Sequence, residues 1–139
     1  MKKTLYCIFI SIALIACKQS VTKKEIAKIT GYWEINKAKL PDGSYKDYKV
    51  NETIDYFGVK NNKGFRQKVM PQFNGSYKTN GIKETFTISN VEGVFYIHYV
   101  TPYGKWQEEI IEVQDSSLVL RNKEQLEYHY KRHRPFSIK

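Results

Sequence analysis

The sequence predicts an all-β fold, a single antiparallel β-barrel with a short helix before its first strand. Turn signals such as Asn80-Gly81 and Glu92-Gly93 recur at short intervals, which is typical of an antiparallel meander that forms a barrel or a sandwich. Between the turns apolar and polar residues alternate, so that Leu118 and Leu120, for example, share one face of a strand. No segment of helical period is long enough to connect parallel strands, which argues against an α/β fold.

The helix is expected directly ahead of the first strand. The run Thr22-Lys23-Lys24-Glu25 fits a capping box, in which the Thr and Glu side chains bond to backbone N–H groups at the start of a helix. One or two helical turns are therefore expected from Lys23 to about Ile29. Strands rich in β-branched and aromatic residues are expected after it at Tyr32–Lys39, Tyr45–Val59, Gly64–Val69, Phe73–Thr79, Lys83–Ser89, Val94–Thr101, Lys105–Val113, Ser117–Arg121 and Gln125–Arg132.

The segment Val94–Val100 is apolar or aromatic on both faces. Such a strand is typically buried on both sides. One face is expected to point into the barrel, and the other either to lie under the helix or to form an exposed patch. His98, within this segment, is expected to be a hydrogen-bonded interior histidine or a polar contact to a ligand.

The N-terminus has the pattern of an export signal. Lys2 and Lys3 supply a positive region, and the apolar stretch from Leu5 to Ala16 ends one residue before Cys17. The stretch falls short of the roughly 20 residues that a membrane-spanning helix needs. The end of it, Leu14-Ile15-Ala16-Cys17, resembles a bacterial lipobox.

The lipobox resemblance implies that the chain is cut before Cys17, whose thiol carries a diacylglyceryl group and whose new amine is acylated. It divides the chain into a signal peptide at residues 1–16, a lipidated tether at 17–21 and a barrel domain at 22–139. Two or three acyl chains together hold a protein firmly to a membrane. Because Lys18, and not an Asp, follows the cysteine, the resemblance favours the outer membrane, on its periplasmic or its surface side.

The charge and the cysteine content limit which binding partners and which cysteine chemistry can be expected. The chain has 23 Lys and Arg against 14 Asp and Glu, a net charge of +9, so an anionic membrane surface would attract it. The lysines are scattered and not arranged in a stripe, so no nucleic acid is expected. Cys7 lies in the signal and Cys17 carries the lipid, which leaves the mature domain with no disulfide, no thiolate ligand and no cysteine nucleophile. No metal and no cofactor are expected.

Two short motifs carry a family resemblance. The first strand opens with Gly31-x-Trp33 just after the short helix, and the last strand ends at Arg132. This pair resembles the signature of the lipocalins, and the chain from about residue 22 to 134 is similar to the lipocalin-like domain of lipoproteins from Bacteroidetes-type bacteria. A third lipocalin motif has only a weak counterpart in Thr101-Pro102-Tyr103, which lacks its Asp.

The resemblance implies an up-and-down barrel of about eight strands that forms a cup for a small hydrophobic molecule. It also implies that Arg132, with Arg134 as a rival, packs across Trp33. Independently of the family, a small barrel needs a large side chain to fill its floor, and a guanidinium over an indole adds a cation–π attraction. Gly31, Trp33 and Arg132 are therefore expected to have a structural role.

Aromatic residues supply the candidate ligand site. The chain has 11 Tyr, 7 Phe and 2 Trp, and tyrosines inside a barrel can form apolar walls with polar tips. Because small barrels can also be packed solid, a filled interior is the alternative. Lys63, Arg66 and Lys105, which flank turns, are candidates to meet an anionic head group such as that of a fatty acid. The candidate wall residues are Tyr56, Phe73, Tyr77, Phe86, Tyr96, His98 and Tyr128.

The sequence does not predict an enzyme. It has no G-x-S-x-G, H-E-x-x-H or phosphate-loop motif. Glu108 and Glu109 are neighbours on an expected strand and so face opposite ways, and a solvated strand face is the expected environment of Glu108 and Glu112. A membrane-anchored carrier of a small hydrophobic or amphipathic ligand is the preferred function. A non-catalytic module that binds an envelope protein is the alternative, and clustered carboxylates with shifted pKa values would instead favour an enzyme.

Overall fold

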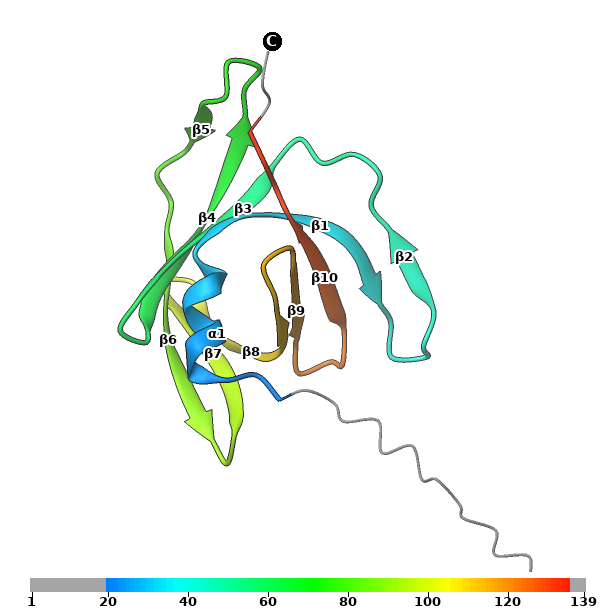
Figure 1. Cartoon of the computed structure of the whole chain (residues 1–139), viewed down its shortest axis with the longest axis vertical. Coiled ribbons are helices and arrows are strands. Elements are labelled where there is room, and N and C mark those ends of the chain that lie inside the picture. Colours follow the sequence, from blue (N-terminus) through cyan, green and yellow to red (C-terminus); the bar gives the residue numbers. More distant parts are fainter. Residues whose placement is uncertain (1–19, 136–139) are drawn as a thin grey trace, which may run out of the picture.

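In the computed structural model, which describes residues 20–135, a single antiparallel sheet closes on itself (Figure 1). Eight strands form the closed barrel, because β10 pairs with β9 on one side and with β1 on the other. This arrangement confirms the predicted fold class. In barrel order these strands are β1 (Gly31–Lys39), β3 (Ile54–Lys60), β4 (Lys63–Pro71), β6 (Glu84–Val91), β7 (Val94–Thr101), β8 (Gly104–Val113), β9 (Ser117–Arg121) and β10 (Glu127–Arg132).

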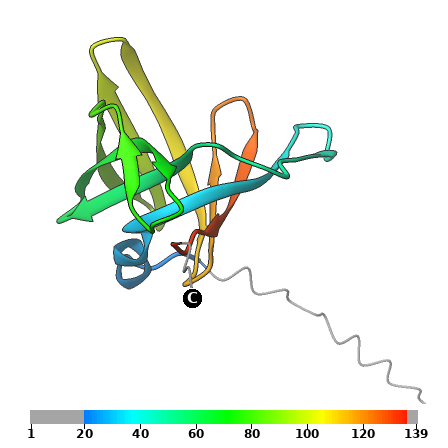
Figure 2. The same cartoon turned by 90° about the horizontal axis from the view of Figure 1, so that it is seen from above.

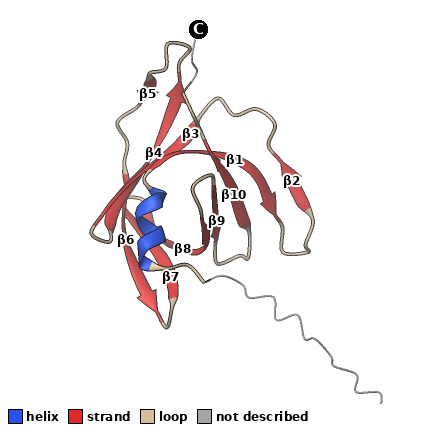
Figure 3. Ribbon diagram, in the orientation of Figure 1, coloured by secondary structure: helices blue, strands red, loops and turns tan. Residues whose placement is uncertain are grey.

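Two further short strands lie outside the barrel circuit. β2 (Tyr45–Asp47) pairs with the second half of β1, and β5 (Tyr77–Thr79) pairs with the second half of β4. Figure 3 shows these added strands as extensions of the barrel wall. β1 pairs with β3, and β4 pairs with β6, only along the first few residues of β1 and of β4. The second halves of β1 and β4 are therefore left to pair with the short strands β2 and β5.

Two predicted strands are too long. The single strand expected at Tyr45–Val59 is two strands, β2 and β3, separated by residues 48–53, where the Asn51 side chain donates a hydrogen bond to the Ile35 carbonyl oxygen at 2.9 Å. The strand expected at Phe73–Thr79 begins only at Tyr77. Phe73 lies in the preceding turn, which closes through a hydrogen bond from the Gly75 N–H to the Gln72 carbonyl oxygen.

The expected helix is confirmed as one short turn of α-helix, α1 (Lys23–Ile26), followed by a 3₁₀ turn, η1 (Ala27–Ile29). The Thr22 N–H donates a hydrogen bond to the Glu25 carboxylate at 2.9 Å. Ile26 and Ile29 are buried in the core and cover one end of the barrel, which we call the closed end. Within residues 20–135 no helix has the length and the apolar character to span a bilayer.

The opposite end, which we call the open end, carries the turns β7–β8 and β9–β10, as Figure 2 shows with α1 at the other end. On most strands the buried apolar side chains that form the core are inward ones. On β6, for example, Phe86 and Ile88 are buried while Thr85 and Thr87 are exposed. The core therefore lies inside the barrel, as the alternation predicts.

On β7 the inward side chains are Phe95, Ile97 and Tyr99, all of them buried. The outward face of the strand is half-buried, and its Val100 is exposed. The doubly apolar segment therefore has one buried face and one partly solvated face.

Trp33 and Arg132 join the elements of the closed end. The Trp33 side chain is fully buried, and its Nε1 donates a hydrogen bond to the Ile29 carbonyl oxygen at 2.7 Å. The Arg132 guanidinium lies 4.2 Å from the centre of the Trp33 ring. It also donates hydrogen bonds to the carbonyl oxygens of Lys28, Thr30 and Asp115. Arg132 thus connects the last strand to the first strand, to the end of η1 and to the β8–β9 turn.

Gly31 leaves room for this guanidinium. A Cβ at this position would overlap Arg132 Nη1, and the φ angle of +141° is one that L side chains rarely adopt. We expect Gly31→Ala to lower the free energy of unfolding by about 1–3 kcal/mol in urea denaturation. Gly43→Ala is the matched control, because Gly43 also has a positive φ, +87°, but has open space around it. An equal loss of unfolding free energy in both variants would show that the alanine at position 31 does not displace the Arg132 guanidinium.

Candidate functional site

Charged side chains gather inside the open half of the barrel. Arg66 on β4 lies directly opposite Glu84 on β6 and donates two hydrogen bonds to its carboxylate, at 3.1 and 3.2 Å. The Arg66 Nη1 also contacts Glu108 Oε1 on β8 at 3.4 Å. The Glu108 side chain is only 5% exposed. Three strands thus aim one cation and two carboxylates into the interior.

Aromatic rings enclose the guanidinium. Arg66 Cζ lies 4.7 Å from the centre of the fully buried Tyr99 ring. Trp106 stacks on Tyr99, with ring centroids 5.0 Å apart and an interplanar angle of 13°. Trp106 is 36% exposed. Its indole therefore lies between Tyr99 and the solvent of the open end.

A second ion pair lies on the neighbouring inward positions. Lys68 Nζ is 2.7 Å from the buried carboxylate of Asp55, while the Lys68 side chain itself is 57% exposed. We refer to Arg66, Glu84, Glu108, Tyr99 and Trp106, together with this pair, as the open-end cluster. In it three carboxylates face two cations.

Burial and neighbouring charges change the pKa values of three groups in the open-end cluster. Burial raises the pKa of Glu108 above its ordinary value, and the Arg66 charge and the Tyr99 hydroxyl only partly oppose this rise. Burial alone would lower the pKa of Arg66, but Tyr99, Glu84 and Glu108 outweigh it, so that the pKa of Arg66 lies above its ordinary value. Burial, followed by the Glu108 charge, raises the pKa of Tyr99 well above its ordinary value. At neutral pH Arg66 is therefore charged and Tyr99 is neutral.

The raised pKa of Glu108 predicts a pH dependence of stability. A carboxyl whose pKa is higher in the folded state than in the unfolded state stabilises the fold most below its ordinary pKa. This contribution is lost as the pH rises through the folded-state pKa. Glu108→Gln has no such loss. We therefore expect the stability of this variant relative to the native chain to increase with pH across that window, by on the order of 1 kcal/mol in urea denaturation. A constant difference from pH 4 to 8 would contradict the raised pKa.

The seven candidate wall residues fall into separate groups. Phe86 is buried inside the barrel, and Tyr128 is half-buried on an inward position of β10. Tyr56 and Tyr77 lie on the outer surface, on either side of Tyr32, whose ring stacks on Tyr77 with centroids 3.9 Å apart and lies 4.8 Å from that of Tyr56.

The remaining candidates are also on the outside. Tyr96 and His98 lie on the outward face of β7, where His98 Nε2 shares a hydrogen bond of 2.7 Å with Ser89 Oγ. Phe73, in the β4–β5 turn, is 81% exposed. The seven residues therefore do not line one common pocket.

Two sequence interpretations of charged residues are wrong. Glu108 does not lie on a solvated strand face, because it faces inward beside Trp106, while Glu112 faces outward beyond a register shift between Ile110 and Glu112. Arg66 lies inside the barrel and not on a rim. One sequence signal could have found the site: Glu84 and Glu108 both lie at period-two spacing from apolar residues that are buried.

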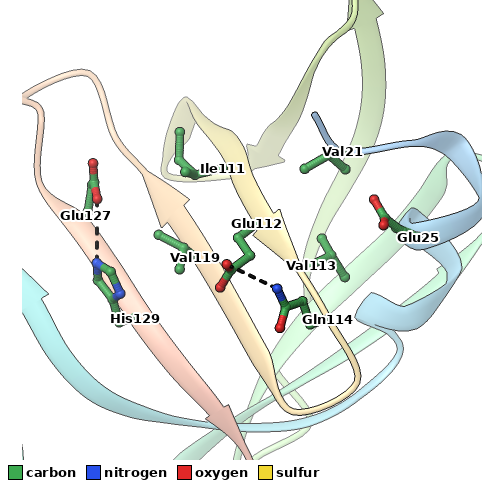
Figure 4. Close-up of a pocket in the computed structure, with 9 residues that line it drawn as sticks. All are labelled: Val21, Glu25, Ile111, Glu112, Val113, Gln114, Val119, Glu127 and His129. Atoms are coloured by element: carbon green, nitrogen blue, oxygen red, sulfur yellow. Dashed lines mark hydrogen bonds and ion pairs between the residues drawn. The ribbon is translucent and has the colours of Figure 1, made fainter. Parts of the chain in front are cut away.

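Several surface cavities lie outside the barrel, and two of them lie beside β10. One, of about 400 Å³, is formed by the outer side chains of β8, β9 and β10 beside the chain that enters α1, with Glu127 and His129 in contact at 3.5 Å (Figure 4). Another, of about 620 Å³, lies beneath residues 48–53 next to the end of β10. Neither contains any of the seven candidates or any member of the open-end cluster. Among the described residues, no three His, Cys, Asp or Glu side chains gather as a metal site.

No family model matches the chain, and no curated protein matches its sequence. The chain is similar to the crystal structure of a lipocalin-like protein from Bacteroides uniformis, with 12% identity over 76% of this chain and 99% of that one and a TM-score of 0.47. It is also similar to an uncharacterized protein from Bacteroides eggerthii, with 15% identity over 75% and 98% and a TM-score of 0.46.

A third similar structure is apocrustacyanin C1, with 10% identity over 81% of this chain and 64% of that one and a TM-score of 0.47. The described part of this chain is itself an antiparallel closed barrel of eight strands with two added strands and one short helix.

Proposed function

We propose that this chain is a lipid-anchored lipocalin-like protein that binds a small amphipathic molecule at the open end of its barrel. The observation that carries the proposal is the open-end cluster, in which charged groups are buried beneath the half-exposed indole of Trp106. Burying charges costs free energy even when they are paired. The chain places them at the end of the barrel that α1 does not cover, and recognition of a ligand is a reason to keep them there.

The ligand is expected at the mouth and not deep in the barrel. Phe57, Phe86, Tyr99 and Tyr130 are all buried in one core cluster, and their rings contact one another. A small apolar group would lie against Trp106, with the exposed Lys68 side chain nearby as a polar contact.

The charges favour one kind of head group. Arg66 already has two carboxylate partners, so a ligand carboxylate would have to displace Glu84 or Glu108. Three carboxylates against two cations instead favour a head group that is cationic or that donates hydrogen bonds. This replaces the anionic head group that the basic residues near turns suggest from the sequence.

Binding explains the cluster better than catalysis does. A buried carboxyl with a raised pKa among other carboxylates is a feature of enzyme sites, although structural ion-pair networks share it. Here both Glu84 oxygens bond to Arg66, Glu108 contacts the same guanidinium, and Asp55 pairs with Lys68. Each carboxylate thus has a cation partner, which favours a binding or structural role of the cluster over that of a catalytic base.

The anchor in this proposal is Cys17. It rests on the sequence pattern, because residues 1–19 lie outside the described part of the chain, and the same pattern supports an outer-membrane location. The mass of the intact protein, purified from its own membranes, tests it. A chain that begins at an acylated Cys17 is expected, whereas an unmodified Cys17 or a retained Met1 would contradict the anchor.

A second candidate function has its own observation. Exposed apolar residues lie in three loops, with Phe73 at 81%, Ile82 at 63% and Tyr103 at 96% exposure. Such residues mark contact surfaces when they gather into a patch. The alternative is therefore a non-catalytic module whose exposed loops bind a protein of the envelope.

Trp106 offers a direct test of ligand binding. The experiment titrates the protein with an alkyl amine, an alcohol and a carboxylate of the same chain length and follows tryptophan fluorescence. We expect the amine and the alcohol to give a saturable change and the carboxylate a weaker one. Trp106→Phe is expected to abolish the change, because the remaining Trp33 is buried at the closed end.

Two results would overturn the proposal. A response that persists in Trp106→Phe would place binding away from the open end. No saturable response to any of the three compounds would favour the protein-binding module.

A further inference from the structure

The closed end is the part of the domain that lies nearest to the proposed anchor. The described chain begins at Ser20, three residues after Cys17, and α1 starts at Lys23. Three extended residues span at most about 10 Å. An acylated Cys17 would therefore keep Ser20 within roughly one Debye length of the membrane surface at physiological salt, and Lys23 follows three residues later.

Exposed lysines gather beside this point. Lys23 and Lys24 lie on α1, and Lys60 and Lys63 flank the turn Asn61–Asn62 between β3 and β4. Lys23 and this turn line the same cavity, of about 330 Å³. We call these four lysines the basic corner. Within residues 20–135 none of the four takes part in an ion pair.

The basic corner contains an unfavourable charge pair. Lys60 and Lys63 are directly opposite each other in the β3–β4 ladder. Like charges in that position destabilise an antiparallel pair. Among the described residues no ion pair joins the Glu25 carboxylate on α1 to either of these lysines. Negative charge from outside the chain would relieve the repulsion.

We propose that the basic corner lies against the anionic head groups of the membrane that holds Cys17. The short tether brings it there, and its positive charge is complementary to such a surface. The closed end then faces the bilayer, and the open end, with Trp106 and Lys68, faces the aqueous phase. The inference rests on the proposed anchor and adds the orientation of the domain to it.

Lysine acetylation of the full acylated protein in vesicles tests this orientation. The intact mass first establishes that Cys17 is acylated, so a failure of the anchor is seen separately. In vesicles of phosphatidylcholine with phosphatidylglycerol, we expect Lys23, Lys60 and Lys63 to react at least about threefold more slowly than in detergent. Lys123, in the β9–β10 turn, and Lys105, at the start of β8, are exposed at the open end and are expected to react at unchanged rates.

Charge-removing variants complete the test. Lys60→Gln/Lys63→Gln is expected to lose the protection of Lys23, and the matched control Lys105→Gln/Lys123→Gln is expected to retain it. Pure phosphatidylcholine vesicles should give weaker protection. Equal acetylation rates at both ends of an acylated protein, or protection of Lys105 and Lys123, would overturn the proposed orientation and leave the anchor intact.

Discussion

Replacing Trp33 with Ala is expected to lower the free energy of unfolding by about 3–5 kcal/mol, the range for truncation of a large aromatic side chain in a core. The fully buried indole fills the closed end and contacts the Arg132 guanidinium at 4.2 Å. Its loss leaves a cavity and removes the hydrogen bond that its Nε1 donates to Ile29. Urea denaturation followed by far-UV circular dichroism measures the effect.

Tyr103→Ala is the matched control for Trp33→Ala. Tyr103 is also a large aromatic residue, but it is 96% exposed in the β7–β8 turn. Its truncation is expected to change the stability by no more than about 0.5 kcal/mol. If Trp33→Ala were as mild as the control, Trp33 would not be what fills the closed end.

Replacing Arg66 with Met is expected to cost about 3–5 kcal/mol at neutral pH, because it leaves buried carboxylates without their cation. Glu108 is the most affected, since its side chain is 5% exposed and its pKa is already raised by burial. Without Arg66 that pKa rises further. The cost should therefore be largest above the raised pKa and should shrink as the pH falls, when Glu108 is protonated in the folded and unfolded states alike.

The double variant Arg66→Met/Glu108→Gln shows how much of the stability lost in Arg66→Met comes from the unpaired Glu108 carboxylate and how much from altered packing. Removing the uncompensated carboxylate is expected to recover part of the stability that Arg66→Met alone loses, and to weaken the pH dependence. Urea denaturation of both variants at pH 5 and pH 8 measures this. A cost of Arg66→Met that is below about 1 kcal/mol, or that does not depend on pH, would mean that the cluster behaves as a solvated surface network.

Local patterns were sufficient to predict the strands of an antiparallel sheet, and the lipocalin resemblance favoured a barrel over a sandwich. The alternation of Phe86 and Ile88 with threonines defines a strand with one buried face, and Gly31-x-Trp33 correctly locates the start of the first strand after the short helix. These features depend on residues close together in the sequence, where the period-two geometry of a strand acts directly.

The open-end cluster could not be predicted in the same way. Arg66 and Glu108 are 42 residues apart, and they meet only because of the register of four strands. Isolated charged residues are seldom buried, so the sequence alone favoured solvent for both. The register shift after Ile110 also breaks the period-two count, so that Glu112 faces outward although it lies four residues after the inward Glu108.

Native mass spectrometry of protein purified gently from its own membranes tests the central claim, that the open end binds a small amphipathic molecule. We predict one bound molecule of defined mass that is released on unfolding and is missing from the Trp106→Ala variant. Protein that is empty in repeated preparations would contradict the claim and leave the protein-binding module as the function of the chain.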